Sequence, residues 1–143
     1  MNQETKAPAH LWIVGILALL WNAIGAFDYA ATELRLDFYM SQFTPAQLDY
    51  FYSFPAWTIA AWAIAVWGSL LASLGLLLRK GWAVGLFGLA ILGLAATTFY
   101  NFVLTDGMAV MGSSVALFTG VIWIIAVSLF FYARALKRRG LLS

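Results

Sequence analysis

The fold class is decided by residues 56–78, which read AWTIAAWAIAVWGSLLASLGLLL. This stretch holds no charged residue and is long enough to span a membrane, because a spanning helix needs about 20 apolar residues to cross roughly 30 Å of hydrocarbon. Pro55 stands immediately before it, at a position suited to a first helical turn. The run is continuously apolar and lacks the period-two alternation of a barrel strand. We therefore predict a transmembrane helix here.

Three further apolar runs are predicted to be membrane-spanning helices, at about residues 11–27, 82–103 and 115–132. The chain of 143 residues is 64% hydrophobic and 10% charged, whereas an ordinary soluble domain carries roughly 25% charged residues. Its length leaves room for one domain. The sequence thus predicts an all-α membrane protein in which residues 1–143 form a single antiparallel bundle of four transmembrane helices.

The basic residues predict the orientation of these helices. Of the 8 Lys and Arg residues, all but Arg35 fall before the first helix, between the second and third, or after the fourth. Those positions lie on one side of the membrane if four helices alternate in direction. Because cytoplasmic loops are enriched in Lys and Arg, we expect cytoplasmic N and C termini and two acidic loops outside.

The first apolar run has an alternative interpretation as a cleaved signal peptide. Ala23-Ile24-Gly25 offers a small-x-small cleavage site. Glu4 stands beside Lys6 in the preceding segment, so that segment lacks a purely basic character. This favours the retained helix.

The first outer loop, about residues 28–54, is predicted to contain a short helix. Thr44-Pro45-Ala46-Gln47 has a capping residue, a proline at the first helical position and a glutamine at the capping-box position. Tyr50, Phe51, Tyr52 and Phe54 follow it. So many aromatic rings beside a membrane boundary indicate a segment lying in the interface. An aromatic belt is favoured over a lid that grips a ligand.

Small residues indicate a tight hairpin between the second and third helices. In lipid, close backbone approach supplies much of the association between helices. The residues predicted to pack in this contact are Ala61, Ala65, Gly68, Ala72, Gly75, Gly81, Gly85 and Gly88.

Polar residues within the predicted spans and at their outer ends are few and define a candidate polar pocket. Asp28 is expected near the outer interface, where a solvated carboxylate at the helix end is favoured over a site residue. Asn22 lies midway along the first helix and needs a hydrogen-bond partner, for which Trp67 is a candidate. A simple interhelical bond is favoured for Asn22 over a ligand contact. If a pocket does open outward, its lining is expected to be Asn22, Asp28, Trp62, Trp67, Tyr100 and Asn101. Amides beside aromatic rings suit a neutral polyol or sugar.

Several classes of function find no support in the sequence. The chain has no cysteine and one histidine, His10, so neither a Cys-based metal site nor bis-histidine haem ligation is available. No nucleophile, phosphate-binding or metalloprotease motif occurs. A net charge of +2, with scattered basic residues, does not suit nucleic acid. We expect no enzyme activity, cofactor or metal.

A resemblance to a known group is carried by Trp21-Asn22 through Gly25-Ala26-Phe27-Asp28-Tyr29 and by Tyr50-Phe51-Tyr52-Ser53-Phe54-Pro55. Asp106-Gly107-Met108 and Met111-Gly112 extend it over nearly the whole chain. The chain resembles small uncharacterised bacterial four-helix integral membrane proteins, some of which carry an automatic "sugar transporter" label. The resemblance implies a bacterial cytoplasmic (inner) membrane and carries over no site residue.

Two classes of function are therefore expected. The first is an accessory or structural subunit that packs with another membrane protein or with itself. The alternative is a transporter of a neutral small solute such as a sugar, which requires a homo-oligomer because four short helices rarely enclose a path. An enzyme is the third class, and neither it nor a quinone-linked redox helper is favoured by any residue. The lipid bilayer is the common partner of all three.

Overall fold

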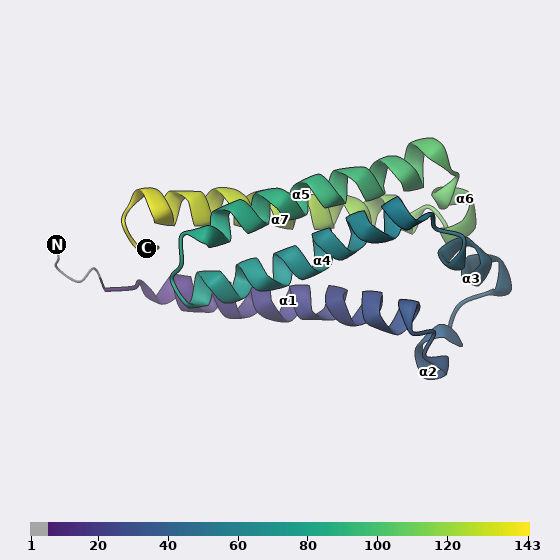
Figure 1. Cartoon of the computed structure of the whole chain (residues 1–143), viewed down its shortest axis with the longest axis horizontal. Helices are drawn as coiled ribbons and strands as arrows, with labels where there is room; N and C mark the ends of the chain where they lie inside the picture. Colours follow the sequence, from purple (N-terminus) through teal and green to yellow (C-terminus); the bar gives the residue numbers. More distant parts are fainter. Residues whose placement is uncertain (1–5) are drawn as a thin grey trace.

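The computed structural model describes residues 6–143, and these are helical with no β-strand (Figure 1). The long helices are α1 (Ala9–Glu33), α4 (Ala56–Leu77), α5 (Trp82–Phe99) and α7 (Ser114–Arg138). The short ones are α2 (Asp37–Met40), α3 (Pro45–Tyr52), the π-helical turn η1 (Tyr100–Leu104) and α6 (Gly107–Met111). Within these residues, 4 helical segments are long and apolar enough to cross a membrane.

Each predicted span coincides with one of these segments. α1 and α7 extend beyond the apolar runs, to Glu33 and Arg138, because the helix continues into polar sequence. The third span runs from Trp82 to Leu104 and ends in η1. The prediction of four helices long and apolar enough to span a membrane is confirmed.

The long helices pack in a defined order. α4 lies between α1 and α5, and α5 packs in turn on α7 (Figure 1). In the described part of the chain, α1 and α7 do not form an extensive contact with each other. They meet through two side-chain contacts, His10 with Tyr132 and Trp21 with Phe118.

The contact between α4 and α5 depends on glycines that differ in part from the predicted set. A Cβ at Gly93 would lie 2.5 Å from the Ala61 carbonyl oxygen, and Gly68 lies against Ala90. Ala61, Ala72 and the other buried small residues of α4 agree with a close approach.

The structure corrects the predicted role of three glycines in that contact. Gly81 lies against Lys137 and Ser143, near the C-terminal end of the chain. Gly85 is exposed and a Cβ there would meet nothing within 4 Å, so it takes no part in the packing of α4 on α5. Gly88 faces Phe130 of α7 instead of α4. Gly85 and Gly88 were predicted to pack there from their small size alone. Their positions around α5 direct Gly85 to open space and Gly88 toward α7.

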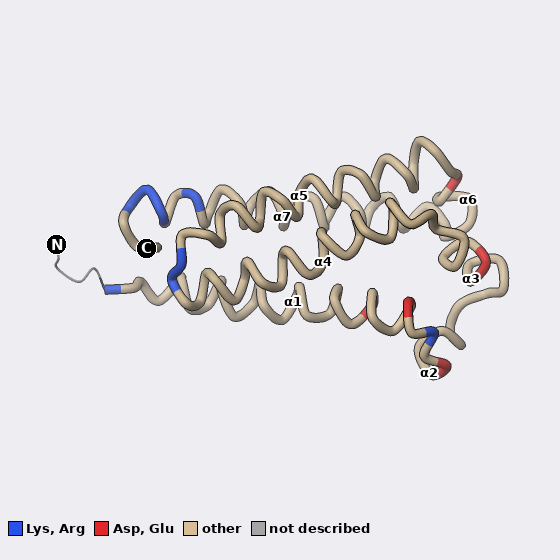
Figure 2. Tube along the Cα trace, in the orientation of Figure 1, with Lys and Arg blue, Asp and Glu red and all other residues tan. Residues whose placement is uncertain are grey.

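Charge separates the molecule into two ends (Figure 2). We call the end that holds Lys6, Arg79, Lys80 and the basic part of α7 the basic end. The opposite end carries Asp28, Glu33, Asp37, Asp49 and Asp106, and we call it the acidic end. The buried hydrophobic cluster lies toward the basic end, with Leu11, Leu76, Phe87 and Leu136 among its members.

Short helices cover the acidic end. α3 begins as predicted, with the Gln47 amide nitrogen donating to the Thr44 hydroxyl at 3.2 Å and the Thr44 amide donating to the Gln47 side chain at 3.1 Å. This reciprocal pair satisfies two amides that the first turn of a helix otherwise leaves unpaired. Asp106 caps α6 in a similar way, through the Ala109 amide.

Candidate binding cavity

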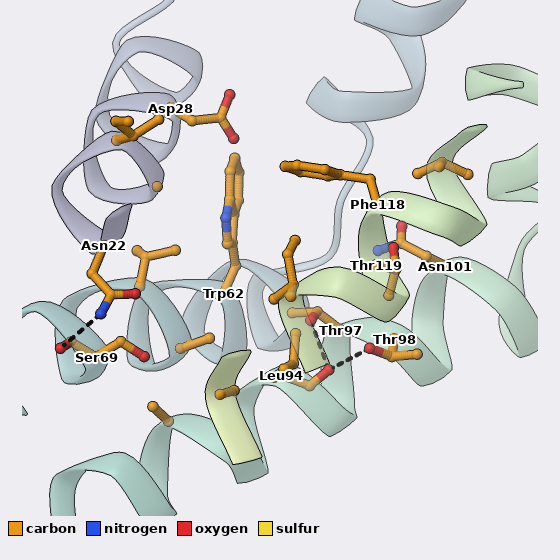
Figure 3. A pocket seen from close by; sticks show the side chains of 18 of the residues that line it. Asn22, Asp28, Trp62, Ser69, Leu94, Thr97, Thr98, Asn101, Phe118 and Thr119 are labelled. Carbon is orange, nitrogen blue, oxygen red and sulfur yellow. Dashed lines mark hydrogen bonds between the residues drawn. The ribbon is translucent and has the colours of Figure 1, made fainter. Parts of the chain in front are cut away.

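A cavity of about 460 Å³ lies between the long helices and extends from the acidic end into the interior of the molecule. All four long helices line it, and α3 and α6 cover its end (Figure 3). The cavity exists because α1 and α7 do not pack extensively on each other. Side chains, and not a helix–helix contact, enclose the space between these two helices. The volume falls in the range of small-molecule sites, about 300–1,000 Å³.

Asn22 reaches the cavity wall from α1, and its amide is already engaged. Its Nδ2 atom donates to the Ser73 hydroxyl at 2.8 Å and, more weakly, to the Ser69 carbonyl at 3.4 Å. The Ser73 hydroxyl donates onward to the same Ser69 carbonyl at 2.9 Å. The partner of Asn22 is therefore this pair of serines on α4, and not Trp67 as the sequence suggested.

Asp28 lies one and a half turns beyond Asn22 on α1 and also lines the cavity. Its carboxylate accepts a hydrogen bond from the Tyr39 hydroxyl, which α2 brings back over the end of α1. Burial, together with this hydrogen bond and the negative charge of Asp28, raises the pKa of Tyr39 above its ordinary value. Tyr39 therefore keeps its proton and acts as the donor.

Aromatic rings form the wall beside Asp28. Trp62 from α4 stands next to the carboxylate, and the ring of Phe118 from α7 points toward the same space (Figure 3). Tyr29 contacts Trp62 edge to face with ring centroids 4.8 Å apart. Phe54 contacts Trp62 from the other side at 6.1 Å. These contacts fix the Trp62 ring in place.

A second polar group closes the acidic end of the cavity. The Tyr50 hydroxyl on α3 donates to the Asn101 side-chain oxygen at 2.6 Å and shares a 2.8 Å hydrogen bond with Thr105. Gly107 permits this arrangement, because a Cβ there would lie 3.0 Å from the Tyr50 hydroxyl and 2.7 Å from the Asn101 carbonyl. Burial raises the pKa of Tyr50, so its hydroxyl stays protonated and keeps donating.

The structure brings four of the six predicted pocket residues together. Asn22, Asp28, Trp62 and Asn101 all line the cavity. Trp67 does not: it is 40% exposed and contacts Tyr29 from the outside. Tyr100 is buried behind the cavity wall, where its ring packs against Phe54 and Trp57.

The contribution of α7 was missed by sequence reasoning, although a signal for it exists. Phe118, Ile122, Ile125 and Leu129 all line the cavity and recur at the three-to-four spacing of one helix face. The pairing of Asp28 with Tyr39 has no such signal, because it depends on the path of the chain between α1 and α2.

The cavity lining carries one ionisable acid and no base. Among the described residues, Asp28 is the carboxylate that lines it, and no Lys, Arg or His does. The described residues also contain no group of three or more side chains that could hold a metal ion. The lining can therefore accept hydrogen bonds, offer aromatic faces and attract positive charge.

No family model, curated protein or solved structure matches the chain.

Proposed function

We propose that this chain is an integral membrane protein that binds a small molecule in the cavity between α1 and α7. The cavity carries the proposal, because it combines a volume of about 460 Å³ with a mostly apolar lining that holds a limited number of polar groups. The four long helices would form an antiparallel transmembrane bundle with α3 in the interface. The charge separation favours a basic end in the cytoplasm, in keeping with a bacterial inner membrane.

Binding at this site would serve transport only in an oligomer, as the sequence analysis expects. Phe87 and Leu129 of the buried hydrophobic cluster also line the cavity, and the rest of that cluster fills the space toward the basic end. A path through the membrane would therefore need a second copy. We propose no catalysis, since the lining holds no nucleophile placed beside a base.

An accessory-subunit function is the second candidate, and the exposure of α7 favours it. Only 6% of the most apolar window of α7 is buried, against 22% to 33% for the other three spans. A helix face so open can pack against another membrane protein or a second copy of this chain. Leu117, Val121 and Ile124 are exposed on α7 and do not line the cavity, so one protein can have both properties.

Native mass spectrometry of the protein, extracted from its own membrane in mild detergent, tests the two candidates together. Ala126 lines the cavity, so Ala126→Trp should fill it and remove a bound small molecule. Ala116→Trp is the matched control, because Ala116 is exposed on the same helix and does not line the cavity. A small molecule retained by wild type and the control, and lost from Ala126→Trp, is the expected result. A stoichiometric second membrane protein with no small molecule would favour the accessory subunit instead.

A further inference from the structure

The charge of the cavity lining is unbalanced. Asp28 lines it, and no base does among the described residues. Arg35, the one basic residue at the acidic end, lies with its guanidinium carbon 3.9 Å above the ring of Tyr52 and does not line the cavity. The guanidinium group of Arg35 therefore faces Tyr52 and not the cavity. Asp28 is half-buried, and a nearby cation stabilises a carboxylate that is partly withdrawn from water. Among the described residues, the cavity lining supplies no such cation.

The amides that favoured a neutral solute are engaged in part by the protein itself. Asn22 uses its amide nitrogen for Ser73, and the Asn101 oxygen accepts from Tyr50. Asp28 accepts one hydrogen bond, from Tyr39, whereas a carboxylate offers about four lone-pair sites. Asp28 is therefore the charged acceptor of the lining, and it keeps capacity for a ligand donor.

The rings around Asp28 present faces and edges to the same space. Trp62 stands beside the carboxylate and Phe118 approaches from the facing helix (Figure 3). Trp21 lies against Phe118, with ring centroids 6.1 Å apart, and also lines the cavity. Aromatic faces attract cations, and quaternary ammonium groups are commonly bound between such rings.

The cavity also reaches the apolar side surface of the molecule. Ile24 of α1 and Phe118 of α7 both line it, yet they are 68% and 56% exposed. An apolar molecule dissolved in the bilayer could therefore enter between α1 and α7. Ile125 and Leu129 line the far part of the cavity, which suits a hydrocarbon group.

We infer that the cavity takes an amphiphilic organic cation, whose ammonium group lies against the Asp28 carboxylate between the rings of Trp62 and Phe118. The apolar part of the ligand lies toward α7 and the buried end of the cavity. This inference rests on the proposed function, because it names the ligand class of the same site. A neutral sugar is the competing ligand class.

Calorimetric titration of the full-length protein in nanodiscs of zwitterionic lipid tests the inference with three probes. Benzyltrimethylammonium is the cation, neopentylbenzene is its uncharged carbon isostere, and methyl glucoside is the neutral sugar. Binding counts as cavity binding when Ala126→Trp abolishes it. Asp28→Asn removes the charge and keeps the shape, and Glu33→Gln is the matched control, since Glu33 is an exposed carboxylate at the end of the same helix.

The cation is expected to bind at least about tenfold more tightly than its isostere, because the carboxylate and the rings both act on the charge. Asp28→Asn should remove that preference and Glu33→Gln should keep it. Trp62→Leu, which leaves Asp28 intact, should weaken binding of the cation several-fold. This variant replaces Asp28→Asn in the test if Asp28→Asn does not fold.

Two results would overturn the inference, and they are distinguishable. The cationic ligand would be refuted if the isostere or methyl glucoside bound in the cavity as tightly as the cation. It would also be refuted if both Asp28→Asn and Trp62→Leu left the cation preference unchanged. Either outcome would leave the cavity as a binding site. No cavity binding by any probe would count against the proposed function itself.

Discussion

The Asn22 amide donates a 2.8 Å hydrogen bond to the Ser73 hydroxyl and joins α1 to α4 at the inner edge of the cavity. Ser73 is fully buried and its hydroxyl donates a hydrogen bond to the Ser69 carbonyl, so the amide of Asn22 completes a short chain of donors. Such bonds between helices in a membrane are worth ~1 kcal/mol or less each. This contact sets the distance of α1 from α4, and thereby one wall of the cavity.

The first prediction concerns the stability contributed by this bond. Asn22→Ala and Ser73→Ala should each lower the free energy of unfolding by about 1 kcal/mol, and the double variant should lose less than the sum. Unfolding in mixed micelles, followed by circular dichroism, provides the measurement. Strictly additive losses would show that the two side chains do not interact.

A second prediction separates the two glycines of α5. Gly93→Leu should disrupt the packing of α5 on α4, because even its Cβ would lie 2.5 Å from the Ala61 carbonyl oxygen; the cost should be about 3 kcal/mol or more. Gly85→Leu should change stability by no more than about 0.5 kcal/mol, since its surroundings are open. Thermal unfolding of both variants checks the difference. Equal losses would contradict the helical register described above.

A third prediction concerns the cover of the cavity. Tyr50→Phe removes the donor to Asn101 and leaves that side chain with one partner fewer, at a cost of about 1–2 kcal/mol. Hydrogen exchange should become faster in α3, while the long helices keep their protection. Tyr52→Phe is the matched control, because it retains the ring beneath Arg35. Unchanged exchange in α3 of Tyr50→Phe would show that the bond does not hold the cover in place.

Alkaline pH provides a fourth prediction. The folded-state pKa of Tyr50 is raised above its ordinary value of 10.0, chiefly by burial. Its stabilising contribution is therefore complete below pH 10 and is lost as pH rises from there through the raised folded-state pKa, because the unfolded chain ionises first. Stability should fall as pH rises above about 10, and the fall should be shallower in Tyr50→Phe. Identical slopes would argue against a buried, proton-donating Tyr50.

Features that depend on local sequence were predictable here. The apolar length of residues 56–78 specifies a spanning helix wherever its neighbours lie, and the Thr44–Gln47 cap involves residues within one turn. Gly85 and Gly93 show the limit of this reasoning. Eight residues at about 100° each place them roughly 80° apart around the helix, so only one can face α4. Composition alone does not say which of the two glycines faces α4.

The cavity itself depends on arrangement in space. Asp28, Trp62 and Asn101 were identifiable as rare polar or aromatic groups at membrane depth. Tyr39 and Phe118 reach the same space through the path of the first loop and through the separation of α7 from α1. Neither relationship follows from a periodicity, and both determine the charge and the walls of the site.

The most direct test of the central claim is a high-resolution structure of the protein purified from its own membrane, with α1 and α7 both resolved. The account predicts ligand density between these helices, in contact with Asp28 and Trp62, and absent in Ala126→Trp. A cavity closed by α7 packed directly on α1, with no space for a ligand, would contradict it.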